Sequence, residues 1–210
     1  MKGIRLYIEG GGDGRDQKSE LRKGFSTFFS PLVGMARARR LNWDITMSGG
    51  LRSAYEDFEA AIRRHPNSFN ILLIDAEKPV THASPWEHLR IHEKWNNPSV
   101  SDEHCHLMVL NVEAWILADV ETLTNYYGKG FNRNRIPGDP NVESIPKRDL
   151  EDALDEATRQ TQKGRYNKVR HCAELLSRLS VTTVRKKAPH CERLFATIEE
   201  KLQGLATGGP

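Results

Sequence analysis

Carboxylates that follow predicted strands are the residues of this sequence best suited to chemistry. Glu9 ends a short β-branched and aromatic run, and three glycines and Asp13 come directly after it. Asp75 and Glu77 follow a second apolar run, and Glu113 follows a third. Open α/β sheets place their sites at the carboxyl ends of parallel strands. We therefore expect these side chains to gather along one edge of a sheet.

Several carboxylates in one place repel one another unless a positive charge neutralises them. Mg²⁺ and Mn²⁺ prefer such oxygen ligands, and either ion can clamp a phosphate and activate a water. We predict that Glu9, Asp75 and Glu77 ligate Mg²⁺ or Mn²⁺, with Glu9 also a candidate general base. Asp13 and Glu113 are predicted as supporting catalytic acids. The alternative is that these acids are caps and ion-pair partners, which applies most to Glu113 in the first turn of a helix.

The order of the predicted elements sets how these acids are positioned. Apolar β-rich runs predict strands over 4–8, 42–47, 69–74 and 107–112. Helical periodicity predicts helices over 19–40 (kinked or split at Pro31), 52–65, 113–125, 149–160, 168–179 and 189–202. This alternation predicts an α/β fold with a mostly parallel sheet flanked by helices and a helical C-terminal region.

Changes in composition divide the chain further. We predict an α/β core over 1–127, interrupted by a Pro-, His- and Trp-rich inserted segment over 78–103. A helical, basic region over 128–206 is expected to pack on this core. Residues 207–210 are expected to form a disordered tail.

The bulk composition excludes several classes of protein. The 210 residues are 38% hydrophobic and 28% charged, which is typical of a soluble globular protein. No run approaches the about 18 apolar residues of a membrane span. The chain enters a predicted strand at once, without the pattern of a signal peptide. We therefore expect a cytoplasmic protein that has no membrane partner.

Positive charge is concentrated in the C-terminal third. Residues 163–193 contain nine Lys or Arg and two Glu, whereas the whole chain carries a net charge of only +3. Such a surface could hold a phosphate backbone, and an interleaved tyrosine could stack on a base. The predicted nucleic-acid-binding residues are Lys163, Arg165, Tyr166, Lys168, Arg170, Arg185, Lys186 and Lys187. The alternative is a structural turn followed by a solvated basic helix.

The cysteines and histidines give weaker signals. Each of the three cysteines directly follows a histidine, a spacing that structural zinc sites do not use. Buried free thiols are the better interpretation. His82, His88 and His92 lie in the inserted segment, and His88 and His92 would share one helix face. They fit either structural hydrogen bonding or acid–base chemistry.

Two of these motifs resemble a known fold. Glu9-Gly10-Gly11-Gly12-Asp13 after one strand and Asp75-Ala76-Glu77 after another resemble the Toprim fold of topoisomerases, primases and OLD-family nucleases. The resemblance implies that the first glutamate and the acidic pair bind Mg²⁺. Glu77 departs from the pattern, because many catalytic Toprim proteins have a second aspartate there.

Nearly the whole chain is also similar to a bacterial domain-of-unknown-function family with a Toprim-like front. The matching segments are Pro85-Trp86-Glu87-His88-Leu89, His106-Leu107-Met108-Val109, Glu113-Ala114-Trp115-Ile116-Leu117-Ala118-Asp119, Tyr126-Tyr127-Gly128 and Lys163-Gly164-Arg165-Tyr166-Asn167-Lys168. This similarity implies a neighbouring gene for an ABC- or OLD-like ATPase and a role in defence against phage.

The resemblance and the acidic motifs together predict a Mg²⁺-dependent nuclease that cleaves DNA or RNA. One alternative is a Toprim-derived binding subunit that docks on an ATPase or nucleic acid without productive metal geometry. Another is a hydrolase of small phosphorylated nucleotides. The oligomeric state stays open between a homodimer and a larger assembly with the ATPase.

Overall fold

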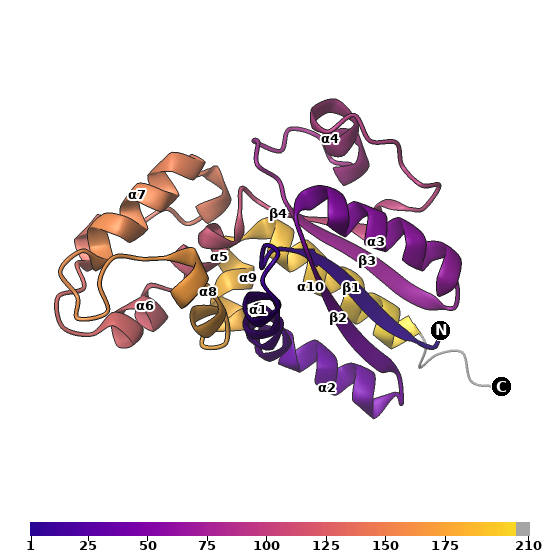
Figure 1. Cartoon of the computed structure of the whole chain (residues 1–210), viewed down its shortest axis with the longest axis horizontal. Coiled ribbons are helices and arrows are strands. Elements are labelled where there is room, and N and C mark those ends of the chain that lie inside the picture. Colours follow the sequence, from indigo (N-terminus) through magenta and orange to yellow (C-terminus); the bar gives the residue numbers. More distant parts are fainter. Residues whose placement is uncertain (205–210) are drawn as a thin grey trace.

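A four-stranded sheet in which all strands run in the same direction lies at the centre of the protein (Figure 1). The computed structural model describes residues 1–204, so the predicted tail at 207–210 lies outside the described part. The strands are β1 (Gly3–Glu9), β2 (Asn42–Gly49), β3 (Ser68–Asp75) and β4 (Cys105–Met108), in the order β2-β1-β3-β4. The predicted parallel α/β fold is confirmed.

Within residues 1–204, ten α-helices flank this sheet or form the C-terminal region, and the predicted helical C-terminal region is confirmed. They are α1 (Arg15–Phe28), α2 (Ser30–Ala38), α3 (Leu51–Arg64), α4 (Pro85–His92), α5 (Val112–Ala118), α6 (Val120–Tyr127), α7 (Lys147–Thr158), α8 (Lys168–Leu176), α9 (Val181–Lys187) and α10 (Pro189–Gly204). Pro31 lies in the first turn of α2, so the expected helix over 19–40 is split. The expected helix over 113–125 is also split, because Asp119 caps α6 by accepting a hydrogen bond from the Thr122 backbone N–H.

The two faces of the sheet have separate hydrophobic cores. Helices α3 and α4 cover one face, where Tyr7 and Leu72 of the sheet meet Phe58 and Trp86. The other face belongs to a larger cluster that contains Leu6 and residues of α1, α2 and the helices from α5 to α10. This larger core therefore joins the sheet to the C-terminal helices. In Figure 1, helices α6, α7 and α8 lie beyond the end of the sheet that is opposite the N-terminus, whereas α10 runs alongside the sheet.

The contact between α1 and α8 positions the start of α8. Gly24 of α1 lies so close to α8 that a Cβ atom there would come within 2.5 Å of the Ala173 carbonyl oxygen. Only glycine permits this approach without a shift of backbone. Asn167 caps α8 by accepting a hydrogen bond from the Arg170 N–H. The two helices thus hold Lys168, the first residue of α8, at a pocket that Glu9 also lines.

The fourth strand ends earlier than the sequence predicted. We expected a strand over 107–112, but β4 covers Cys105–Met108. Backbone hydrogen bonds continue beyond it, since the Glu77 N–H donates to the Leu110 carbonyl, but the regular ladder stops. The expected strand at 107–112 is therefore wrong at both ends, because an apolar run does not mark where ladder hydrogen bonds stop. Glu113 consequently lies in the first turn of α5 and not at a strand end.

Two other expectations concern features away from the sheet edge. The three cysteines are all buried free thiols, as the sequence indicated. Among residues 1–204, no helix combines the length and the apolar composition needed to cross a membrane.

Candidate active site

Glu9 and Asp75 are the last residues of two neighbouring strands. β1 and β3 pair in parallel, with Ile8 opposite Leu73, so both strands deliver their final side chains to one edge of the sheet. Glu9 Oε2 accepts a hydrogen bond of 3.1 Å from the Asp75 backbone N–H. The structure thus brings together the first predicted acid and the first acid of the predicted pair.

The glycine turn after Glu9 brings α1 close to this edge. Gly10 and Gly11 have φ angles of +136° and +85°, which favour glycine. A Cβ atom on Gly10 would lie 2.8 Å from Leu21, and one on Gly11 would lie 2.9 Å from Lys18. Side chains in the turn would therefore clash with α1. Asp13 follows in the same turn, where it is exposed and forms no ion pair within residues 1–204.

Asp75 is buried without full compensation for its charge. Its Oδ1 atom has no hydrogen-bond partner in the described chain, and its Oδ2 atom lies 3.6 Å from Lys168 Nζ. Burial raises the pKa of Asp75 to about 7, although Lys168 opposes this effect. Burial and the charge of Asp75 likewise raise the pKa of Glu9 to about 7. Two neighbouring carboxylates that are costly to ionise are typical of a site that binds an additional cation.

Lys168 connects Asp75 to a third acid. Its Nζ atom lies 3.3 Å from Glu113 Oε2, and the Tyr166 hydroxyl donates a hydrogen bond of 3.0 Å to Glu113 Oε1. Burial alone would lower the pKa of Lys168, but the carboxylates of Asp75 and Glu113 outweigh it and raise the pKa. The Glu113 side chain is only 4% exposed, whereas half of the Lys168 side chain remains exposed. Two carboxylates therefore hold the positive charge of Lys168 in place, and the exposed half of its side chain is accessible to a ligand.

Glu77 is turned toward a different partner. Its Oε2 atom lies 2.6 Å from the Nζ atom of Lys147, the first residue of α7. Glu77 also has a φ angle of +58°, so the chain turns sharply after Asp75. The carboxylate of Glu77 raises the pKa of Lys147 against the opposing effect of burial. Of the three predicted metal ligands, Glu9 and Asp75 are in contact, and Glu77 is held by a lysine that sequence reasoning did not select.

We tested whether this edge suits a divalent cation. Within residues 1–204, no group of three or more His, Cys, Asp or Glu side chains is arranged to hold a metal ion. A pocket of about 90 Å³ is nevertheless lined by Glu9, Asp75 and Lys168, and the buried Oδ1 atom of Asp75 has no hydrogen-bond partner within residues 1–204. Mg²⁺ commonly binds through one or two carboxylates, with waters and substrate phosphates completing its octahedron. The residues present fit a two-carboxylate site of this kind.

The predicted nucleic-acid-binding residues have different environments. Three of the basic side chains already contact other side chains of the protein. Arg185 forms ion pairs with Glu192 and Glu199, Arg165 pairs with Asp155, and Lys163 lies over the Tyr126 ring. Tyr166 is anchored by Glu113 and is not free to stack on a base. The remaining residues are Lys168 at the acidic edge, Arg170 and Lys186, which are exposed, and Lys187, which is partly buried.

The histidines of the inserted segment have structural contacts. His88 is buried, and its Nε2 atom lies 3.0 Å from the Ala76 carbonyl oxygen, next to the acidic edge. Burial lowers the pKa of His88, which favours its neutral form. The His88 and His92 rings lie 4.5 Å apart on one face of α4, as their spacing predicted.

Comparison with known proteins gives one family match. The family described as Domain of unknown function (DUF4276) matches residues 8–199, a range that includes every residue of the acidic edge. Searches of curated proteins and of solved structures give no match.

Proposed function

The chain belongs to the DUF4276 family, and from the geometry of its acidic edge we propose that it is a divalent-cation-dependent hydrolase of phosphodiester bonds in nucleic acid. The contact between Glu9 and Asp75 carries this proposal. Both carboxylates have a pKa raised to about 7, and Asp75 keeps a buried oxygen without a partner. A divalent cation would relieve the cost of ionising both groups.

Glu9 and Asp75 are the residues that would hold Mg²⁺ or Mn²⁺. The bound ion would polarise a phosphate oxygen and lower the pKa of a coordinated water. Lys168 lies beside Asp75 with half of its side chain exposed, so it would bind the substrate phosphate. The Glu113 carboxylate accepts a hydrogen bond from the Tyr166 hydroxyl and pairs with Lys168, so it holds the Lys168 ammonium group in place. Glu9 would act either as a ligand of the ion or, where it does not bind the ion, as a general base, because its pKa without the ion is about 7.

The Toprim-like character of the site, the ATPase partner and the role in defence are proposed from the resemblance to Toprim proteins. The parallel sheet, with Glu9 at the end of β1 and Asp75 at the end of β3, supports a Toprim-like site with a glutamate at the second acidic position. We further propose that an ABC- or OLD-like ATPase is the partner and that the nuclease acts in defence against phage. Arg170, Lys186 and Lys187 remain candidates for contacts with the strand.

One observation favours a second candidate function. Lys168 already pairs with both Asp75 and Glu113, and Lys147 pairs with Glu77. A protein that has lost its metal could keep these lysines as permanent substitutes for the ion. The alternative is therefore a non-catalytic subunit that binds the ATPase or nucleic acid.

Cleavage assays distinguish the two candidates. Labelled single-stranded DNA, RNA and free nucleotides should be incubated with the protein, alone and with the ATPase, in Mg²⁺, Mn²⁺ or EDTA. We expect cleavage of a polymer that requires the cation and falls at least about a hundredfold in Glu9→Gln. Glu200→Gln, an exposed change on α10, is the matched control. Normal partner binding without cation-dependent cleavage of any substrate would instead establish the binding subunit.

A further inference from the structure

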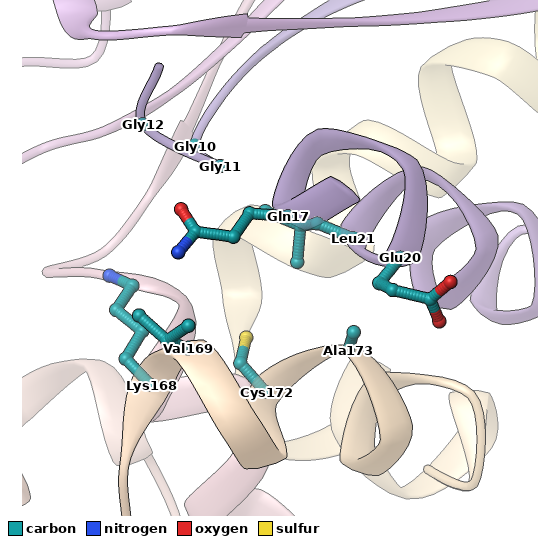
Figure 2. A pocket seen from close by; sticks show the side chains of 10 residues that line it. All are labelled: Gly10, Gly11, Gly12, Gln17, Glu20, Leu21, Lys168, Val169, Cys172 and Ala173. Carbon is teal, nitrogen blue, oxygen red and sulfur yellow. The ribbon is translucent and has the colours of Figure 1, made fainter. Parts of the chain in front are cut away.

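A second cavity opens beside the acidic edge, between α1 and α8 (Figure 2). Its volume is about 300 Å³, and it shares Gly10, Leu21 and Lys168 with the smaller pocket that Glu9 and Asp75 line. The two spaces are therefore adjacent, with Lys168 at their boundary. A ligand in the larger cavity could reach the carboxylates without leaving the protein surface.

The walls of the α1–α8 cavity are mostly apolar. Leu21 lines one side, and Val169, Cys172 and Ala173 of α8 line the other. Val169 is 64% exposed, and only one other large hydrophobic side chain in the described chain is exposed. An aliphatic side chain left exposed at the mouth of a cavity is a candidate contact for an apolar ligand.

Polar groups are confined to the end of the cavity near the acidic edge. In Figure 2, the amide of Gln17 and the ammonium of Lys168 extend toward the same side, whereas the Glu20 carboxylate is turned away. Glu20 pairs with Lys23. The Gln17 amide makes no hydrogen bond with another residue of the described chain, so its donor and acceptor are available to a ligand.

We propose that this cavity receives the nucleobase of the nucleotide whose phosphate binds to Lys168 and to the cation that Glu9 and Asp75 would hold. This inference rests on the proposed function, since it needs a phosphate at the acidic edge. A nucleobase has apolar faces for Leu21 and Val169 and a hydrogen-bonding edge for Gln17. The cavity is at the lower limit of the range of about 300–1,000 Å³ that small-molecule sites occupy, which suits one nucleotide unit.

The chemistry of the cavity also limits other ligands. A lipid chain offers no hydrogen-bonding edge to the Gln17 amide, and a peptide has no obligatory anion for Lys168. A nucleotide satisfies the apolar walls, the amide and the ammonium together. A base that must enter a cavity between two helices has to be unpaired, so single strands are the expected polymeric substrate.

Binding measurements test the inference independently of cleavage. Fluorescence anisotropy should compare labelled oligothymidylate, oligouridylate and an abasic strand of equal length, with Ca²⁺ replacing Mg²⁺. We expect the wild-type protein to bind a strand with bases about tenfold more tightly than the abasic strand. Gln17→Ala and Val169→Asn should remove most of this difference by deleting the amide and the apolar contact at the mouth of the cavity. Ser19→Ala, an exposed change on α1, should preserve it.

The outcomes separate this inference from the proposed function. Equal affinity of the wild-type protein for strands with and without bases would overturn the inference, whether or not the protein cleaves nucleic acid. A preserved base preference in both cavity variants would also overturn it. A base preference without cation-dependent cleavage would overturn the proposed function and leave the subsite in place. Displacement of the strands by thymidine monophosphate or uridine monophosphate at similar affinity would support the subsite with a free nucleotide as its occupant.

Discussion

Replacing Asp75 with asparagine is expected to abolish cation-dependent hydrolysis and to raise the free energy of unfolding at pH 8 by up to about 4 kcal/mol. The two effects have the same cause. The aspartate is buried, its Oδ1 atom has no hydrogen-bond partner within residues 1–204, and its pKa is raised to about 7. Folding at pH 8 must therefore hold a charge that the surroundings stabilise poorly. Asparagine removes that charge together with a proposed metal ligand.

The sign of the pH dependence follows from the raised pKa. The carboxyl of Asp75 ionises at about pH 4 in the unfolded chain and at about pH 7 in the folded protein. Between these values the folded state binds the additional proton, so this group reduces stability as the pH rises from about 4 to about 7. The gain from Asp75→Asn should be full at pH 8 and nearly absent at pH 4.

Urea unfolding at pH 8 and pH 4 measures this gain. Asp57→Asn, an exposed change on α3, is the matched control and should leave both stability and hydrolysis unchanged. A loss of stability in Asp75→Asn at pH 8 would contradict the assignment of Asp75 as an undercompensated charge.

Replacing Lys168 with methionine is expected to have the opposite effect on stability. The change would leave the buried carboxylates of Asp75 and Glu113 without their shared positive partner. Removing one member of a buried ion pair costs about 3–5 kcal/mol. Half of the Lys168 side chain is exposed, so we expect a smaller loss of about 2 kcal/mol at pH 8.

Unfolding curves at two pH values test the electrostatic origin of that loss. Lys168 lowers the pKa of Asp75, so its removal shifts the ionisation of Asp75 to higher pH and the carboxyl is neutral at pH 5. The loss should therefore be smaller at pH 5 than at pH 8. Arg170→Met on the same helix, exposed and without an ion pair in the described chain, is the control. An equal loss at both pH values would mean that Lys168 contributes through packing and not through charge.

The residues of the site that could be predicted from the sequence are identified by their immediate neighbours in the chain. Glu9 and Asp75 each end an apolar run that is long enough to identify a buried strand. Parallel pairing then places both residues at one edge by geometry alone. The split of the first long helix was predictable for the same reason, because Pro31 acts through its immediate neighbours.

The features of the site that could not be predicted depend on contacts between residues that are far apart in the sequence. The pairing of Glu77 with Lys147 joins residues 70 positions apart, and that of Glu113 with Lys168 joins residues 55 apart. No local pattern distinguishes these lysines from the many others on the surface. Lys168 was predicted to bind nucleic acid as one of a basic group, but its position among carboxylates follows from the close packing of α8 on Gly24.

These contacts leave Glu9 and Asp75 as the two carboxylates of the acidic edge that would bind the ion. Lys147 pairs with Glu77, and Lys168 adds a positive charge beside Asp75 that would take the place of a second ion. We propose that a single cation and Lys168 act together on one phosphate. Lys168 would then contribute both to stability and to substrate binding.

A crystal structure with Mn²⁺, located by its anomalous scattering, is the most direct test of the central claim. We expect one Mn²⁺ ion bound by the carboxylates of Glu9 and Asp75, at about 2.1 Å from each ligand oxygen. Asp75→Asn crystals soaked in the same solution should lack the ion. If wild-type crystals show no Mn²⁺ at this edge, with Asp75 still paired to Lys168, the protein is not a cation-dependent hydrolase.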